Sequence, residues 1–120
     1  MKLEVKNLSK NFRNIVAVND ISFSIEKNKT LGLLGPNGCG KTTSIGMMLG
    51  LITPSSGKIL IDNRLLNEKN KINLLSLMNF ASPYIELPKK LTVFQNLNVY
   101  ARLYGVKNIN QRIEEMTEDL

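Results

Sequence analysis

Histidine is absent from the 120 residues, and Cys39 is the single cysteine. Without an imidazole, histidine-based acid–base and triad chemistry is excluded within these residues. A single cysteine cannot form an internal disulfide, and a chain without Cys/His clusters offers no structural zinc site. Any chemistry of this chain must therefore depend on other side chains or on the backbone.

Long apolar runs are absent as well. No uninterrupted apolar segment approaches the length of a membrane span, and residues 1–7 alternate apolar and charged side chains, unlike a signal peptide. Internal repeats and low-complexity tracts are also missing. We therefore expect a cytoplasmic chain whose association with a membrane depends on a partner.

Charge is not clustered in this sequence. The net charge is +6, but lysine and arginine are spread from Lys2 to Arg112 without a dense run. A solvated, mildly basic surface accounts for this spread better than a nucleic-acid-binding patch, so no nucleic acid partner is expected. The hydrophobic content of 42% is ordinary for a soluble globular protein, which favours one folded domain over disorder.

A glycine-rich stretch, residues 35–42, fits the pattern G-x-x-x-x-G-K-[ST] at every fixed position. Residues 30–34 before it predict a strand buried on both faces, and a helix is predicted from about Lys41 to Leu51. Glycines let several backbone N–H groups point at one anion, and the helix N-terminus adds its dipole. Lys41 then supplies a charge for outer phosphates, and the Thr42 hydroxyl is a hard oxygen ligand for Mg²⁺. The stretch predicts a nucleoside triphosphate site; the alternative is a glycine-rich turn with a surface lysine.

The chain is predicted to be an α/β protein with a P-loop NTPase core. We expect an antiparallel β subdomain over about residues 1–29, the P-loop core over 30–90, and the start of a helical subdomain over 91–120. Strands are predicted at residues 2–6 and 21–25, because apolar and polar side chains alternate there. Alternation of this kind is typical of a half-solvated antiparallel sheet.

The predicted core continues after the first helix, which the Pro/Gly segment 53–57 is expected to end. Residues 58–62 predict a short strand, residues 67–73 a loop and residues 74–81 another core strand. An apolar strand ending in Asp62 is also the pattern of the second Mg²⁺-organising element in P-loop enzymes. Too little chain separates it from residues 35–42 for a crossover, so we interpret it as an edge strand entering a turn.

Two helices are predicted at the end of the chain. The first begins at Thr92, where Thr92 and Gln95 have capping-box spacing, and ends at Gly105. The second begins near Asn108 or Asn110, and its acidic end lacks a closing Gly or Pro, so the chain is expected to be truncated within an element. Apolar stripes predicted to face a core are Val93, Leu97, Tyr100, Ala101 and Tyr104, then Ile109, Ile113, Met116 and Leu120.

In this order the features resemble the N-terminal portion of the ATP-binding module of ABC transporters. Phe12 falls where that family stacks an aromatic ring on adenine, and residues 35–43 match the Walker A loop. Residues 16–23 resemble the strand pair before that loop, and residues 53–59 the turn after its helix. Residues 91–97 resemble the start of the helical subdomain that contacts the membrane partner.

The resemblance implies ATP and Mg²⁺ as cofactors. Phe12 would hold the base, main-chain groups of residues 37–41 the phosphates, Lys41 the outer phosphates with a catalytic role, Thr42 the Mg²⁺ and Thr43 the inner phosphate. The nucleotide-binding set is Phe12, Gly35, Pro36, Asn37, Gly38, Cys39, Gly40, Lys41, Thr42 and Thr43. Implied partners are a transmembrane permease subunit at the inner face of the cell membrane and a second ATP-binding subunit in a head-to-tail dimer.

The sequence departs from the family pattern in two ways. The family places a glutamine where this chain has Pro83, so Glu86 is the expected substitute for coupling or metal coordination. The signature sequence, the catalytic carboxylate and the switch histidine of the family are not found in these residues. We therefore expect ATP hydrolysis by a full-length protein, whereas this chain alone binds nucleotide weakly and hydrolyses none.

Three functions remain open from the sequence. The first is the ATP-binding subunit of an ABC transporter, which couples ATP binding and hydrolysis to transport. The alternative is a soluble ABC-family ATPase acting on ribosomes or nucleic acid, and a third is an unrelated P-loop kinase or GTPase. Cys39 lies at a helix N-terminus beside a cationic site, so alkylation of its thiol and protection by ATP are expected; the alternative is a slot that needs a small residue.

Overall fold

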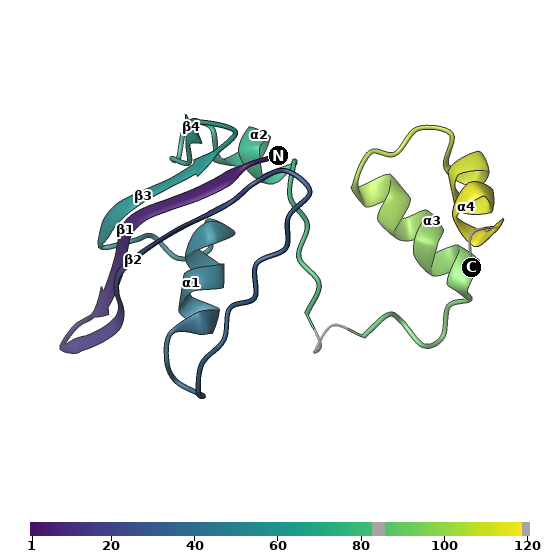
Figure 1. Cartoon of the computed structure of the whole chain (residues 1–120). Coiled ribbons are helices and arrows are strands. Elements are labelled where there is room, and N and C mark those ends of the chain that lie inside the picture. The colour runs from purple at the N-terminus through teal and green to yellow at the C-terminus, as the bar shows by residue number, and fades with distance from the viewer. Residues whose placement is uncertain (83–85, 119–120) are drawn as a thin grey trace. The chain divides into compact units, whose positions relative to one another are not determined.

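The computed structural model describes residues 1–82 and 86–118 as two compact units, Met1–Asn79 and Phe80–Leu120 (Figure 1). The units meet in sequence between Asn79 and Phe80. The boundaries predicted near residues 29 and 90 stay predictions. Pro83, aligned with the family glutamine, lies outside the described residues.

A four-stranded sheet organises the first unit. Its strands are β1 (Leu3–Phe12), β2 (Ile15–Ile25), β3 (Ser56–Ile61) and β4 (Arg64–Leu65), in the order β2-β1-β3-β4 with every neighbouring pair antiparallel (Figure 1). The antiparallel sheet predicted ahead of residues 35–42 is confirmed, with longer strands than expected. The β-branched residues after Asn14 continue β2, so Phe12 pairs with Ile15 at the end of a hairpin.

The core of this unit lies between the sheet and two helices. Helix α1 (Lys41–Met48) contributes Met47, and the short helix α2 (Lys71–Leu75) contributes Leu74, each 1% exposed. The buried strand residues are Leu3, Val5, Leu8, Val18, Ile59 and Ile61. Helix α1 ends before the predicted Leu51, because Gly50 adopts a φ of +63° and its N–H bonds to the carbonyl of Met47 at 3.0 Å.

Residues 30–34 do not form the predicted strand. Leu31, Leu33 and Leu34 are 45%, 38% and 92% exposed. A strand buried on both faces needs hydrogen-bonded neighbours on both sides. Among the described residues no strand pairs with this segment, so its apolar pattern has no sheet to join.

The strand predicted over residues 74–81 is also wrong, and the loop predicted over 67–73 gives way to α2. Asn67 explains the change, because its Oδ1 accepts the N–H groups of Lys69 and Asn70 at 2.9 and 3.2 Å. Asn70 in turn donates its side-chain amide to the carbonyl of Leu65 at 2.7 Å. These local bonds favour a turn and a helix start, and Leu74 then buries its side chain from a helical position.

Asp62 enters a turn, as predicted, but β3 is not an edge strand. Asp62 and Asn63 have φ of +47° and +61° and form the two-residue connection between β3 and β4, so β4 is the edge. The Oδ1 atom of Asp62 accepts the backbone N–H of Lys2 at 2.7 Å. This carboxylate therefore ties the start of β1 to the β3–β4 turn.

An ion-pair chain lies along the sheet near the N-terminus. Lys6 Nζ lies 2.8 Å and Lys2 Nζ 3.4 Å from the carboxylate of Glu4, and Lys2 Nζ also lies 3.1 Å from Glu26. The hydrogen bond from Lys6 holds the pKa of Glu4 below its ordinary 4.5. The carboxylates of Glu26 and Glu4 raise the pKa of Lys2 above 10.5.

The second unit contains α3 (Val93–Leu103) and α4 (Ile109–Glu118). The predicted capping box is confirmed: Thr92 Oγ1 accepts the N–H of Gln95 at 3.2 Å, and Gln95 Oε1 accepts the N–H of Thr92 at 2.9 Å. Gly105 ends the first helix at a φ of +65°, also as predicted. Neither helix, nor any other among the described residues, is long and apolar enough to cross a membrane.

The apolar stripe predicted on α3 is only partly covered within this unit. Val93 and Tyr104 are 72% and 61% exposed, whereas Leu97 and Ala101 are half-buried. Two helices shield one side of each other and leave the remaining faces open. Leu120, at the end of the second predicted stripe, lies outside the described residues.

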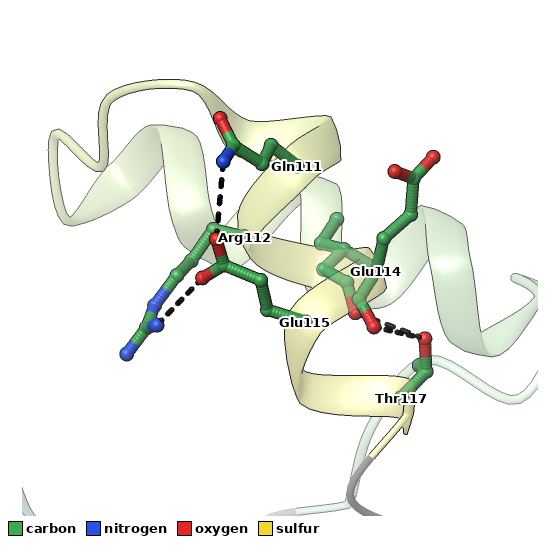
Figure 2. A network of polar contacts seen from close by, with 6 residues as sticks. Gln111, Arg112, Glu114, Glu115 and Thr117 are labelled. Carbon is green, nitrogen blue, oxygen red and sulfur yellow. Dashed lines mark hydrogen bonds and ion pairs between the residues drawn. The ribbon is translucent and has the colours of Figure 1, made fainter.

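Helix α4 is stabilised along its exposed face by short-range side-chain contacts (Figure 2). Glu115 accepts hydrogen bonds from Gln111 Nε2 at 3.2 Å and from Arg112 Nη1 at 2.9 Å. Thr117 Oγ1 donates to the carbonyl of Glu114 at 2.9 Å. Side-chain contacts between residues three and four apart stabilise a helix, each by a few tenths of a kcal/mol.

Candidate nucleotide-binding site

Gly35 and Gly40 of the loop of residues 35–42 combine a positive φ with a close contact, so any side chain there would be strained. A Cβ atom at Gly35, where φ is +154°, would lie 2.5 Å from Cys39 Sγ. A Cβ at Gly40, where φ is +93°, would lie 2.3 Å from the carbonyl oxygen of Ala17 on β2. The loop therefore folds closely over its own cysteine and against the sheet.

Lys41 reaches back over this loop. Its Nζ donates to the carbonyl oxygens of Gly35 at 2.6 Å and Pro36 at 2.7 Å, and lies 3.7 Å from Cys39 Sγ. The first residue of α1 thus places its positive charge at the centre of the loop. Because carbonyl dipoles compensate that charge only partly, the arrangement suits a strongly anionic ligand.

The N-terminus of α1 opens into the same loop. Gly40 is the N-cap, and no side chain among the described residues caps this end. Thr42 is exposed, Thr43 is half-buried and Ser44 is buried. The uncapped N–H groups of the first turn and the accessible Thr42 hydroxyl are the groups that a phosphate and a hard cation require.

An open hollow of about 440 Å³ lies between this loop and the sheet. It is lined by residues 16–19 of β2, by Leu33 and Leu34, and by residues 38–41. The exposed leucines before the loop thus form part of its wall. The hollow brings the backbone of the loop, Cys39 and Lys41 to one place beside β2.

Phe12 does not line that hollow. It is the last residue of β1, its side chain is 46% exposed, and the Nζ of Lys10 lies over its ring, 5.0 Å from the centroid. In Figure 1 the tip of the β1–β2 hairpin and the loop before α1 lie toward the same end of the first unit. Nine of the ten predicted binding residues, 35–43, thus lie in the loop or in the first turn of α1. The tenth, Phe12, lies outside the hollow.

Lys10 was not predicted as part of the site. A usable signal existed, because residues two apart on a strand point to the same face, which places Lys10 beside Phe12. Glu86, the expected substitute for the family glutamine, is paired with Lys89 at 2.8 Å in the second unit. Its role stays a prediction.

Known proteins resemble this chain along nearly its whole length. The lipopolysaccharide export system ATP-binding protein LptB of Haemophilus influenzae is 38% identical over 110 residues, covering 91% of this chain and 43% of that protein. An uncharacterized ABC transporter ATP-binding protein of Bacillus subtilis, YhcH, is 38% identical over 117 residues, covering 97% and 37%. The chain thus spans less than half the length of these relatives.

Solved structures that are similar to this chain are also ABC transporter ATP-binding proteins. An ABC transporter ATP-binding protein from Pyrococcus furiosus, described as putative, matches 98% of this chain and 56% of its own with a TM-score of 0.78 and 29% identity. This likeness confirms the predicted P-loop NTPase fold. The ABC transporter family model matches residues 18–120. With the loop geometry and these relatives, the match establishes that the chain belongs to the ABC transporter family.

Proposed function

We propose that this chain is the phosphate-binding portion of an ABC transporter ATP-binding subunit, and that the whole protein couples ATP binding and hydrolysis to transport. The observation that carries the proposal is the Lys41 ammonium held 2.6 Å from the carbonyl of Gly35, in a loop closed by glycines. ATP competes with those carbonyls for the ammonium. Membership of the ABC transporter family supports the choice of ligand.

The residues present fit Mg-ATP. The backbone of residues 37–41 and the side chain of Lys41 hold the phosphates, Thr42 offers its exposed hydroxyl to the metal, and Thr43 reaches the inner phosphate. Bound Mg²⁺ neutralises charge on the phosphate oxygens. Among the described residues no cluster of three or more acidic, Cys or His side chains could bind a metal alone, so Thr42 and the nucleotide phosphates are the groups that would hold Mg²⁺.

Phe12 is proposed to hold the adenine base. Its half-exposed ring offers a face for stacking, which needs no base-specific hydrogen bond. Phosphate affinity and base affinity therefore come from separate parts of the first unit. Because these parts are separate, phosphate affinity and base affinity can each be measured with a different ligand.

This chain alone is proposed to bind ATP without hydrolysing it. The loop cradles phosphate and neutralises charge, but its residues include no carboxylate placed to orient an attacking water. The whole protein is proposed to act as a head-to-tail dimer with a transmembrane permease at the inner face of the membrane. ATP turnover by the purified chain that is lost in Lys41→Ala would contradict the first statement.

Thermal unfolding with and without Mg-ATP tests the proposal. A ligand that binds only the folded state raises the unfolding midpoint, and the rise grows with ligand concentration. We expect Mg-ATP to raise the midpoint of the wild-type chain and of Lys29→Ala, whose side chain is exposed in the turn before residue 30. Lys41→Ala should show no such rise. A wild-type chain that Mg-ATP does not stabilise overturns the proposal.

A further inference from the structure

We propose that Lys10 is a positioning residue for the adenine base: its ammonium covers one face of the Phe12 ring and leaves the other face to the nucleotide. The inference rests on the proposed function, in which this chain binds ATP through Phe12. It adds a residue and a physical role that the loop itself does not provide.

The contact follows from the geometry of β1. Lys10 and Phe12 are two residues apart on the strand and share a face. The Nζ of Lys10 lies over the ring, 5.0 Å from its centroid, within the distance at which a cation is attracted to an aromatic face. One face of the ring is thereby occupied, although the side chain of Phe12 as a whole is 46% exposed.

Lys10 is itself fixed by the segment that follows α1. Its Nζ donates to the carbonyl oxygen of Thr53 at 2.7 Å. The residues on either side of Lys10 are tied to the same segment: the carbonyl of Ser9 accepts the N–H of Ser55 at 2.9 Å, and the N–H of Asn11 donates to Ser55 Oγ at 3.1 Å. The end of β1 is therefore anchored to the turn that leads away from the phosphate-binding helix.

This anchoring gives the ring a defined orientation before nucleotide arrives. An exposed phenylalanine beside the turn of a hairpin otherwise exchanges between rotamers. Fixing its side chain in one rotamer when a ligand binds lowers the affinity for that ligand. An ammonium held by Thr53 restricts that exchange and directs the base to the opposite face. Base affinity should therefore depend on Lys10, whereas phosphate affinity should not.

The test compares ATP with inorganic tripolyphosphate, which has the phosphates but no base, as ligands of the purified chain. Lys10→Met keeps most of the aliphatic stem and removes the ammonium. We expect it to weaken ATP binding about two-fold to five-fold, the effect of one exposed cation–π contact, and to leave tripolyphosphate binding unchanged. Lys6→Met removes the same charge from the same strand, away from the ring, and should change neither affinity.

Other outcomes have distinct meanings. Unchanged ATP affinity in Lys10→Met, or an equal loss for both ligands, contradicts the positioning role, since an equal loss indicates only a long-range charge effect. Phe12→Ala should weaken ATP binding and spare tripolyphosphate. If Phe12→Ala binds ATP like the wild type, the base lies elsewhere and this inference fails while the phosphate site stands. A wild-type chain that binds neither ligand overturns the proposed function and this inference together.

Discussion

Gly40 is the residue at which the phosphate loop meets the sheet. Its backbone approaches β2 so closely that a methyl group would lie 2.3 Å from the carbonyl oxygen of Ala17, at a φ of +93°. Gly32, a few residues earlier, has open space where its Cβ would be and no positive φ. The two glycines therefore form a matched pair for asking what this contact contributes.

Gly40→Ala should lower the free energy of unfolding by about 1 to 3 kcal/mol, because the substitution strains the backbone and forces the loop away from β2. Urea denaturation measures this directly. Gly32→Ala should stay within about 0.5 kcal/mol of the wild type, as surface substitutions usually do. Equal stabilities of the two variants would show that the loop does not need its close contact with Ala17.

Cys39 reports on the occupancy of the loop. Its side chain is exposed, its Sγ lies 3.7 Å from Lys41 Nζ, and it is the single cysteine, so alkylation labels one site. We expect Mg-ATP to slow the labelling rate, because phosphates bound by Lys41 cover the thiol. Tripolyphosphate should protect to a similar extent. Labelling rates that do not change with either ligand would count against phosphate binding in this loop.

Several elements with a clear local pattern could be predicted from the sequence, whereas the state of segment 30–34 and helix α2 could not. The β1–β2 alternation, the Thr92 capping box and the Gly105 helix end involve neighbours in sequence, and the structure has all three. The apolar segment 30–34 has the pattern of a buried strand but forms none, because a strand requires a sheet partner and no described strand pairs with it. Within the site, the motif residues could be predicted, whereas the link from Lys10 to Thr53 spans 43 residues and has no local signal.

The capping box gives a prediction for the second unit. Thr92→Ala removes the hydroxyl that accepts the N–H of Gln95 and should cost about 1 kcal/mol of stability. Thr92→Ser keeps the hydroxyl and should cost much less. Helix content and urea unfolding followed by circular dichroism measure both. If the alanine and serine variants unfold alike, the cap does not stabilise α3.

The ion pairs of Glu4 predict a pH dependence for the sheet. The folded state lowers the pKa of this carboxyl, so the ion pairs stabilise the fold above the unfolded value of about 4.5 and are lost as pH falls through the folded pKa. The wild type should therefore exceed Glu4→Gln in stability at pH 7, and the difference should shrink below about pH 4.5. Urea unfolding at a series of pH values tests this; a difference that does not vary with pH would contradict it.

At the scale of the whole molecule, the proposed phosphate-binding loop lies in the first unit, and the helix pair α3 and α4 forms the second. The loop, α1 and the hairpin that ends in Phe12 all lie within Met1–Asn79, so nucleotide binding is proposed not to require the second unit. The exposed apolar residues include Val93 and Leu103 on α3 and Met116 on α4. In the proposed function, the helical part serves contact with the membrane partner.

The glycine-closed loop with Lys41 is proposed to bind the phosphates of ATP. Isothermal titration of the purified chain with Mg-ATP measures this most directly, with Lys41→Ala as the test variant and Lys29→Ala as its matched control. We predict saturable binding by the wild type and Lys29→Ala, and a loss of at least about ten-fold in Lys41→Ala, since its charged hydrogen bonds to phosphate are gone. Equal affinity of Lys41→Ala and the wild type for Mg-ATP would show that Lys41 does not bind the phosphates.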